Sequence, residues 1–128
     1  MNIVHVVLGK ANPNRMNGVN KVAHNLATTQ VDLGINVTVV GLTNSKKSDQ
    51  LKRKYSLLLF DKKLRKIREV CNYIRSIPKD TIVFFHGGFI LEFYFISTFL
   101  SKLGIRYIFI SHGCYNEMAM KKRYILKK

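Results

Sequence analysis

Two histidine-glycine pairs each follow an apolar run in the second half of the sequence. His86-Gly87 ends one run and His112-Gly113 ends the next, with Ser111 before it. A neutral imidazole, with an ordinary pKa of about 6.5, can accept a proton or hydrogen-bond a substrate hydroxyl. The neighbouring glycines let a ligand approach the backbone closely. One such pair is as well explained by a capped turn, but two of them favour a binding site.

A third candidate segment is the polar loop of residues 9–18, which ends in Asn17-Gly18 before an apolar-periodic stretch. Free backbone N–H groups and the positive end of a helix dipole would suit a phosphate or a sugar hydroxyl there. Lys10 and Arg15 could add positive charge. The alternative is a loop whose glycine only permits a turn. The dinucleotide fingerprint GxGxxG is absent, which disfavours a nicotinamide-dependent dehydrogenase.

The remaining histidines and the cysteines suggest structural roles. His5 lies inside an apolar run and His24 within a helical pattern, so both are interpreted as structural. Cys71 and Cys114 have no CxxC spacing, and the pair His112 and Cys114 has no third metal ligand at a recognisable spacing. We therefore expect no metal, no cofactor and no disulfide framework, as in a reduced cytoplasmic chain.

Apolar periodicity predicts the elements that position these segments. Continuous apolar runs indicate buried strands at residues 2–8, 36–42, 55–60, 81–85 and 106–110. Apolar residues at spacings of three and four indicate helices at 19–33, 61–77 and 89–103, and Gly34, Pro78 and Gly104 end them. This alternation predicts the α/β class, with a Rossmann-like open parallel sheet, helices on both faces and a single domain over 1–128. In such sheets ligands bind at the carboxyl ends of the strands, where the three candidate segments lie.

Composition narrows the classes of partner. The apolar fraction of 47%, with eight Phe and six Tyr, excludes a wholly disordered chain. The net charge of +15 would attract nucleic acid, acidic lipid headgroups or phosphorylated substrates, without choosing among them. No export signal is visible, and the longest apolar run, 89–103, is shorter than the roughly 20 residues needed to cross a bilayer.

Several segments together carry a resemblance to a known family. They are NIVHVVL, the loop with Pro13 and Asn17-Gly18-Val19, VNKVAHNLATTQVDLG, INVTVVGL, TIVFFHGG and LGIRYIFISHGCYNEMAMKKRYILKK. On these segments the chain resembles the N-terminal domain of family 4 glycosyltransferases, retaining enzymes of the GT-B fold. In that family a strand leads to a similar Ser/Thr/Pro-His-Gly turn, followed by a basic helix.

The resemblance implies an acceptor-binding domain. GT-B enzymes have two Rossmann-like domains: the first chiefly binds the acceptor, and the second chiefly binds the nucleotide-sugar donor through a Glu-x7-Glu segment that has no counterpart here. We expect the acceptor half of a glycosyltransferase, acting on a glycan or lipid-linked acceptor in surface polysaccharide biosynthesis. It would be either truncated or completed by a separate donor-binding chain. Because transfer requires both substrates in one geometry, this half alone should turn over negligibly.

The resemblance also implies the site and the location. The expected substrate-binding residues are Asn17, Gly18, His86, Gly87, His112 and Gly113, with His112 as the catalytic candidate. The expected location is cytoplasmic, peripheral to the inner face of the membrane. There the basic helix 61–77 and the tail 121–128 would face anionic lipid; simple solvated charge is the alternative.

The charge also raises a different class of function, a basic nucleic-acid-binding module without catalytic activity. The sequence has no RNA- or DNA-binding motif, and its aromatic residues fall mainly in apolar runs rather than among the basic residues. Nucleic acid is therefore the less favoured partner.

Overall fold

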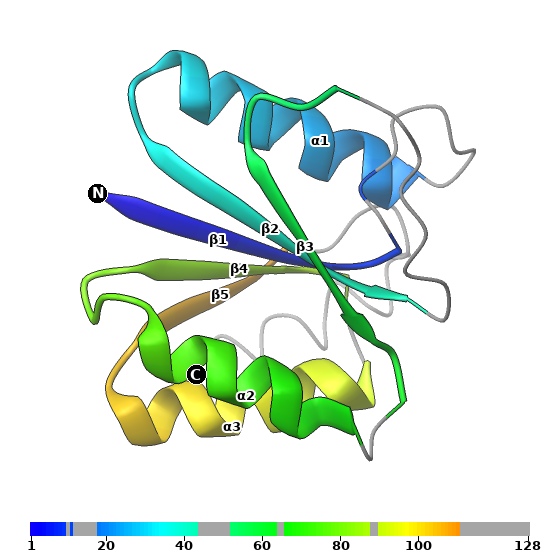
Figure 1. Cartoon of the computed structure of the whole chain (residues 1–128), viewed down its shortest axis with the longest axis vertical. Helices are drawn as coiled ribbons and strands as arrows, with labels where there is room; N and C mark the ends of the chain where they lie inside the picture. The colour runs from blue at the N-terminus through cyan, green and yellow to red at the C-terminus, as the bar shows by residue number, and fades with distance from the viewer. Residues whose placement is uncertain (10, 12–17, 44–51, 64–65, 88–89, 111–128) are drawn as a thin grey trace, which may run out of the picture.

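The computed structural model describes residues 1–9, 11, 18–43, 52–63, 66–87 and 90–110. Within these residues, strands and helices alternate along the chain, except that two strands come in succession between the first and second described helices (Figure 1). The elements are β1 (Asn2–Leu8), α1 (Gly18–Asp32), β2 (Asn36–Thr43), β3 (Ser56–Asp61), α2 (Ile67–Ser76), β4 (Ile82–His86), α3 (Leu91–Leu103) and β5 (Arg106–Ile110).

The strands form one parallel sheet in the order β3-β2-β1-β4-β5. This confirms the predicted open parallel sheet of the α/β class. From the central strand β1 the chain adds β2 and β3 on one side, and it then returns to add β4 and β5 on the other. The order of the strands therefore switches between β1 and β4, and open α/β sheets bind ligands at the carboxyl ends of the strands beside such a switch.

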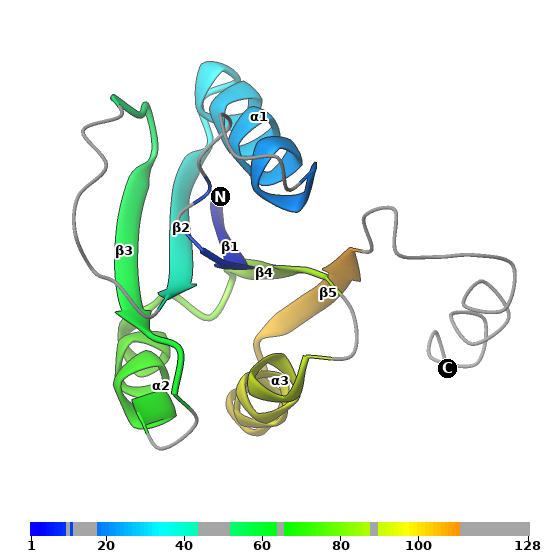
Figure 2. The ribbon, with the colours of Figure 1, turned by 90° about the vertical axis from the view of Figure 1, so that its right-hand side faces the viewer.

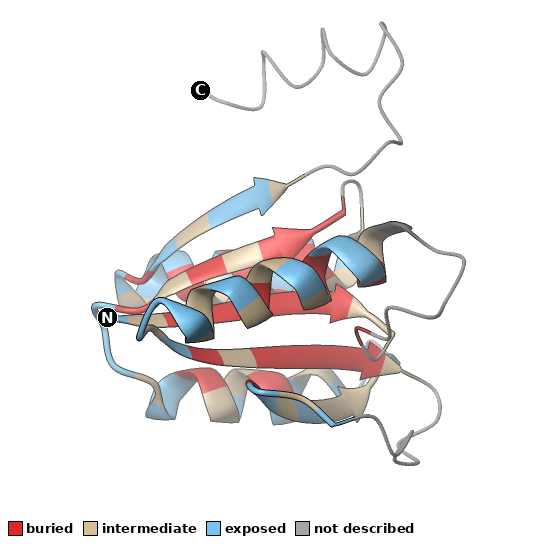
Figure 3. Cartoon of the chain, turned by 90° about the horizontal axis from the view of Figure 1, so that it is seen from above, coloured by how far each residue is buried: buried red, intermediate tan, exposed pale blue. Residues whose placement is uncertain are grey.

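The helices cover both faces of the sheet, as predicted. Figure 2 shows α1 on one face and both α2 and α3 on the other. Right-handed crossovers account for this arrangement, because strands added in opposite directions place their helices on opposite faces. The central strands are mostly buried, whereas β5 at the sheet edge is largely exposed (Figure 3).

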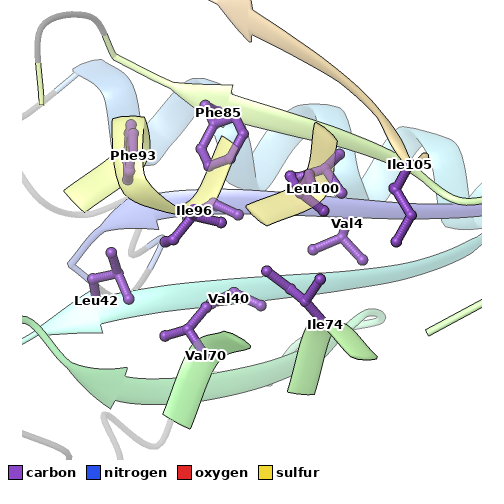
Figure 4. Close-up of a cluster of buried hydrophobic side chains, with 12 residues drawn as sticks. Val4, Val40, Leu42, Val70, Ile74, Phe85, Phe93, Ile96, Leu100 and Ile105 are labelled. Carbon is purple, nitrogen blue, oxygen red and sulfur yellow. The ribbon is translucent and has the colours of Figure 1, made fainter. Parts of the chain in front are cut away.

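Each face has its own hydrophobic cluster. The larger one joins the sheet to α2 and α3 (Figure 4), and its buried members are Val4, Val6, Val40, Leu42, Val70, Ile74, Val83, Phe85, Phe93, Ile96, Leu100 and Ile105. The smaller one joins the sheet to α1 through Ile3, Val7, Ala11, Ala23, Ala27, Val37, Val39 and Tyr55. Alternate residues of the same strands face opposite sides, so β1 and β4 contribute to both clusters.

Glycines end two of the helices, as predicted. Gly34 follows α1 with a φ of 86°, and Gly104 follows α3 with a φ of 74°. Both lie in the left-handed region, where glycine has no steric penalty. Among the described residues no helix is long and apolar enough to cross a membrane.

The predicted start of α2 is wrong. The periodicity indicated a helix from residue 61, but α2 begins at Ile67. Asp61 is instead the last residue of β3, opposite Thr43, and its carboxylate accepts a hydrogen bond from the Lys63 backbone N–H at 2.8 Å. That local turn competes with helix formation. Leu64, which contributed to the predicted apolar stripe, lies outside the described residues.

Candidate functional site

The carboxyl edge of the sheet brings together segments that are far apart in the sequence. Because all strands are parallel, β1 and β4 end at this edge, and α1 begins there. Gly18 is the first residue of α1, His86 is the last residue of β4, and Gly87 follows it. Three of the predicted site residues, Asn17, His112 and Gly113, lie outside the described residues.

The ends of β4 and β5 are joined at this edge. His86 is opposite Ile110 in the strand register, and the Gly87 N–H donates a hydrogen bond to the Ile110 carbonyl at 2.8 Å. Ile110 is also the residue before Ser111 in the sequence. The first predicted histidine turn is therefore fixed to the strand that leads to the second.

His86 contacts a second histidine that the sequence did not link to it. His5 Nδ1 lies 2.7 Å from His86 Nε2, and His5 Nε2 lies 2.6 Å from Gln30 Oε1 on α1. His5 is completely buried and His86 is 1% exposed. The ring of Phe84 stacks on His5, with 5.3 Å between ring centroids. A buried polar chain thus runs from α1 through β1 to the end of β4.

Strand register explains why this pair was missed. The sequence places His5 and His86 in separate apolar runs, and each is compatible with burial. In the sheet, His5 is opposite Phe84, so the next residue of β4 on the same face is His86. Only knowledge that β1 and β4 are neighbours, and in which register, would have predicted the contact.

Burial determines the protonation state of His5. It lowers the pKa of His5 below its ordinary value of 6.5, and the hydrogen bond to Gln30 raises it by a smaller amount. A neutral imidazole has one donor and one acceptor nitrogen. His5 therefore joins Gln30 and His86 as a neutral ring that donates on one side and accepts on the other.

The start of the connection from β1 to α1 is held in an unusual backbone conformation. Gly9 has a φ of 104° and the buried Ala11 a φ of 53°, which is uncommon for a residue with a Cβ. The buried Asn20 on α1 accepts a hydrogen bond from the Ala11 N–H through Oδ1 at 2.9 Å. An added Cβ at Gly41 would lie 2.3 Å from the Gly9 carbonyl oxygen, so β2 needs a glycine there.

A second buried polar group, the hydroxyl of the residue just before β3, supports the same connection. The hydroxyl of the buried Tyr55 lies 2.9 Å from His24 Nδ1 and 3.5 Å from the Ala11 carbonyl, and it accepts a hydrogen bond from Arg53 Nε at 3.0 Å. Partial burial and the Arg53 guanidinium lower the pKa of His24. Neutral His24 can therefore accept the hydroxyl proton of Tyr55 in a hydrogen bond.

The turn after β4 requires glycine for a local reason. Gly87 has a φ of 124°, and an added Cβ would lie 2.9 Å from Ile90 Cδ1 and 3.7 Å from the Phe93 ring. Other residues would be strained by the backbone and crowded by Ile90. This steric need exists whether or not a ligand approaches the turn.

A cavity of about 220 Å³ lies at the opposite, amino-terminal edge of the sheet. Asn2 and Asn36, at the starts of β1 and β2, line it together with Tyr73 and Thr81. The Thr81 hydroxyl is buried and has no hydrogen-bond partner among the residues that the structure describes. The ligand rule for open parallel sheets favours the carboxyl edge instead, and we place the candidate site there.

The described residues contain no group of three or more His, Cys, Asp or Glu side chains that could hold a metal ion. Burial raises the pKa of the Cys71 thiol, which is the opposite of what an activated nucleophile needs. No protein-family model, no curated protein and no solved structure matches the chain. Its activity must therefore be inferred from its own residues and fold.

Proposed function

We propose that the chain is the acceptor-binding half of a retaining glycosyltransferase of the GT-B type. The complete enzyme would transfer a sugar from a nucleotide-sugar donor to a glycan or lipid-linked acceptor in surface polysaccharide biosynthesis. The donor would be bound by a second Rossmann-like half, supplied by another chain or by further sequence. The parallel sheet and the family resemblance of its segments support this proposal.

The carboxyl edge beside the strand-order switch is the observation that carries it. Here the described residues combine a buried histidine pair, His5 and His86, with left-handed backbone at Gly9, Ala11 and Gly87. Uncommon backbone conformations held by surrounding contacts are concentrated at ligand-binding sites. The position of this edge is the one at which open α/β sheets bind ligands.

The proposed roles follow from where each residue lies. The first turn of α1, beginning at Gly18, would present backbone N–H groups to an acceptor, and the Gly87 backbone would border it from β4. The ring of His86 is 1% exposed, so it would act from beneath this edge. Asn17, His112 and Gly113 complete the proposed site on sequence grounds, with His112 as the catalytic candidate that orients the acceptor hydroxyl.

The outer surface supports a peripheral position on the inner face of the membrane, near a lipid-linked acceptor. The exposed side of α2 carries Arg68 and Arg75, and Lys66 precedes the helix. On the neighbouring helix α3, Leu91 and Tyr94 are exposed. Basic and aromatic side chains in combination favour the interface of an anionic bilayer.

Acceptor binding is the direct test, because it does not require the donor half. The chain would be applied to an array of oligosaccharides and polyprenyl-diphosphate-linked sugars. We expect the chain to bind at least one of these sugars, and we expect His112→Ala to weaken that binding at least tenfold. Asn25→Ala, an exposed change on α1, is the matched control and should bind like the parent chain. Absence of binding across the array would contradict the proposal.

The alternative function, nucleic-acid binding, makes a different prediction. If phosphate contacts dominate, affinity for duplex or single-stranded nucleic acid must fall steeply with salt concentration. A titration at several salt concentrations therefore separates the two functions. A steep slope together with no sugar binding would favour the nucleic-acid module.

A further inference from the structure

The buried chain Gln30, His5 and His86 has a direction, because each link needs one donor and one acceptor. Gln30 Oε1 only accepts, so His5 Nε2 must donate across the 2.6 Å contact. Since His5 is neutral, its Nδ1 is then an acceptor. Across the 2.7 Å contact, His86 Nε2 must therefore donate to it.

We infer that Gln30 is a positioning residue that acts through His5 to hold His86 in its Nε2–H tautomer, with Nδ1 as the acceptor nitrogen. In paired histidines, the hydrogen bond on one ring nitrogen determines which nitrogen carries the proton. Gln30 lies on α1 and His86 lies at the end of β4. A residue on the helix of one face therefore determines which ring nitrogen carries the proton at the edge of the sheet.

The opposite direction is chemically possible but less favourable. If the Gln30 amide nitrogen donated, His5 would become Nδ1–H, and His86 would also become Nδ1–H. The Nε2–H form is the more stable neutral tautomer of histidine, and the inferred direction places both rings in that form. Stacking of Phe84 on His5 leaves both nitrogens of the ring in place for these two bonds.

The inferred tautomer restricts what neutral His86 can contact. A group that meets its Nδ1, whether from the protein or from a ligand, must donate a hydrogen bond. Hydroxyl and N–H groups satisfy this condition, whereas phosphate and carboxylate oxygens do not. This consequence for ligands rests on the proposed function, and it selects a sugar hydroxyl over the phosphate of the acceptor.

Ring nitrogen spectroscopy tests the inference without any ligand. Protonated and unprotonated imidazole nitrogens resonate in separate ¹⁵N ranges, so a long-range ¹H–¹⁵N correlation of the labelled full chain near neutral pH reads each tautomer. His24→Gln and His112→Gln assign the other two histidines, and proximity to Phe84 identifies His5. We expect a proton on Nε2 of both rings. A proton on Nδ1 of either neutral ring would overturn the inference.

Variants at position 30 test the role of Gln30 itself. Gln30→Met removes the acceptor at similar volume and should mix the tautomers of both rings. Asn25→Leu, an exposed change on the same helix, should leave the spectrum unchanged. Wild-type tautomers in Gln30→Met would show that Gln30 does not set the direction. If that variant does not fold, the parent spectrum still decides the direction, and failure to bind sugars contradicts only the proposed function.

Discussion

The two faces of the sheet are built from the same strands but bury different chemistry. Toward α2 and α3, β1 and β4 contribute Val4, Val6 and Phe85 to an apolar cluster. Toward α1, the alternate positions of the same strands include His5 and His86 beside apolar residues such as Val7 and Phe84. On the α1 side the polar side chains are buried with partners, whereas the other side is packed almost entirely by hydrocarbon.

This difference implies that the two faces of the sheet contribute differently to stability and to recognition. Apolar burial is non-directional and tolerates substitution by residues of similar volume. A buried hydrogen-bonded chain has a defined geometry and costs free energy when one member is removed. The α2 and α3 side therefore supplies most of the packing, and the α1 side supplies the groups whose donors and acceptors are specified.

The largest effect should come from the apolar side. Phe93 on α3 is completely buried against Phe85. Phe93→Ala should lower the free energy of unfolding by about 3–5 kcal/mol through lost burial and the cavity left behind. Tyr94→Ala, at the adjacent and 66% exposed position, is the control and should change it by less than about 0.5 kcal/mol. Urea unfolding of both variants measures the contrast, and equal effects would contradict the packing described.

Removing a member of the polar chain on the α1 side should cause a smaller loss of unfolding free energy. His5→Leu leaves His86 and Gln30 without the bonds that His5 makes, and it should cost about 1–3 kcal/mol. The double variant His5→Leu/Gln30→Leu should lose less unfolding free energy than the two single variants together. In each single variant one polar side chain is left without its partner, whereas the double variant removes both. Strict additivity in a double-mutant cycle from urea unfolding would argue against the bond between these residues.

The polar side should also make stability depend on pH. The pKa of buried His5 is below 6.5, so below about pH 6.5 the unfolded chain binds a proton that the folded chain does not. Stability should therefore fall as pH drops, by at most about 1.4 kcal/mol per pH unit for one histidine, until the folded pKa is reached. Unfolding measured from about pH 7.5 to 5.5 checks this.

The pH experiment compares variants of the two histidines on the α1 side whose pKa is lowered, with His24→Gln as the control for His5→Leu. His24→Gln should keep the part of the slope that comes from His5, although burial and Arg53 lower the pKa of His24 in the same direction. His5→Leu should reduce the slope and leave only the part that comes from His24. An unchanged slope in His5→Leu would mean that other groups carry it.

The smallest effect should be a gain in stability. Thr81 is buried, and within the described part of the chain its hydroxyl has no hydrogen-bond partner. Thr81→Val replaces the hydroxyl with a methyl group of similar size and should raise the free energy of unfolding by up to about 1 kcal/mol. Ser76→Ala, at an exposed residue lining the same cavity, is the comparison. A loss of stability in Thr81→Val measured by thermal unfolding would show that the hydroxyl is used.

Local patterns predicted much of the fold. The run 106–110 became β5 with the same bounds, and Gly34 and Gly104 ended helices as expected. The predicted start of α2 was wrong because Asp61 pairs with Thr43 in the sheet. The apolar periodicity of one segment carries no information about the strand with which that segment pairs. Long-range pairing overrides local propensity in such cases.

For the candidate site, the sequence by itself determined that His86 and Gly87 stand at the carboxyl end of a strand, and that the carboxyl ends of parallel strands share one edge. The same prediction for His112 and Gly113 falls outside the described residues. The contact of His5 with His86, the buried Asn20 that holds Ala11, and Tyr55 beneath the same connection were decided only by the tertiary structure. Hydrophobic periodicity is a property of neighbouring residues. Which two strands lie side by side, and which face of each strand meets α1, depends on packing across the whole chain.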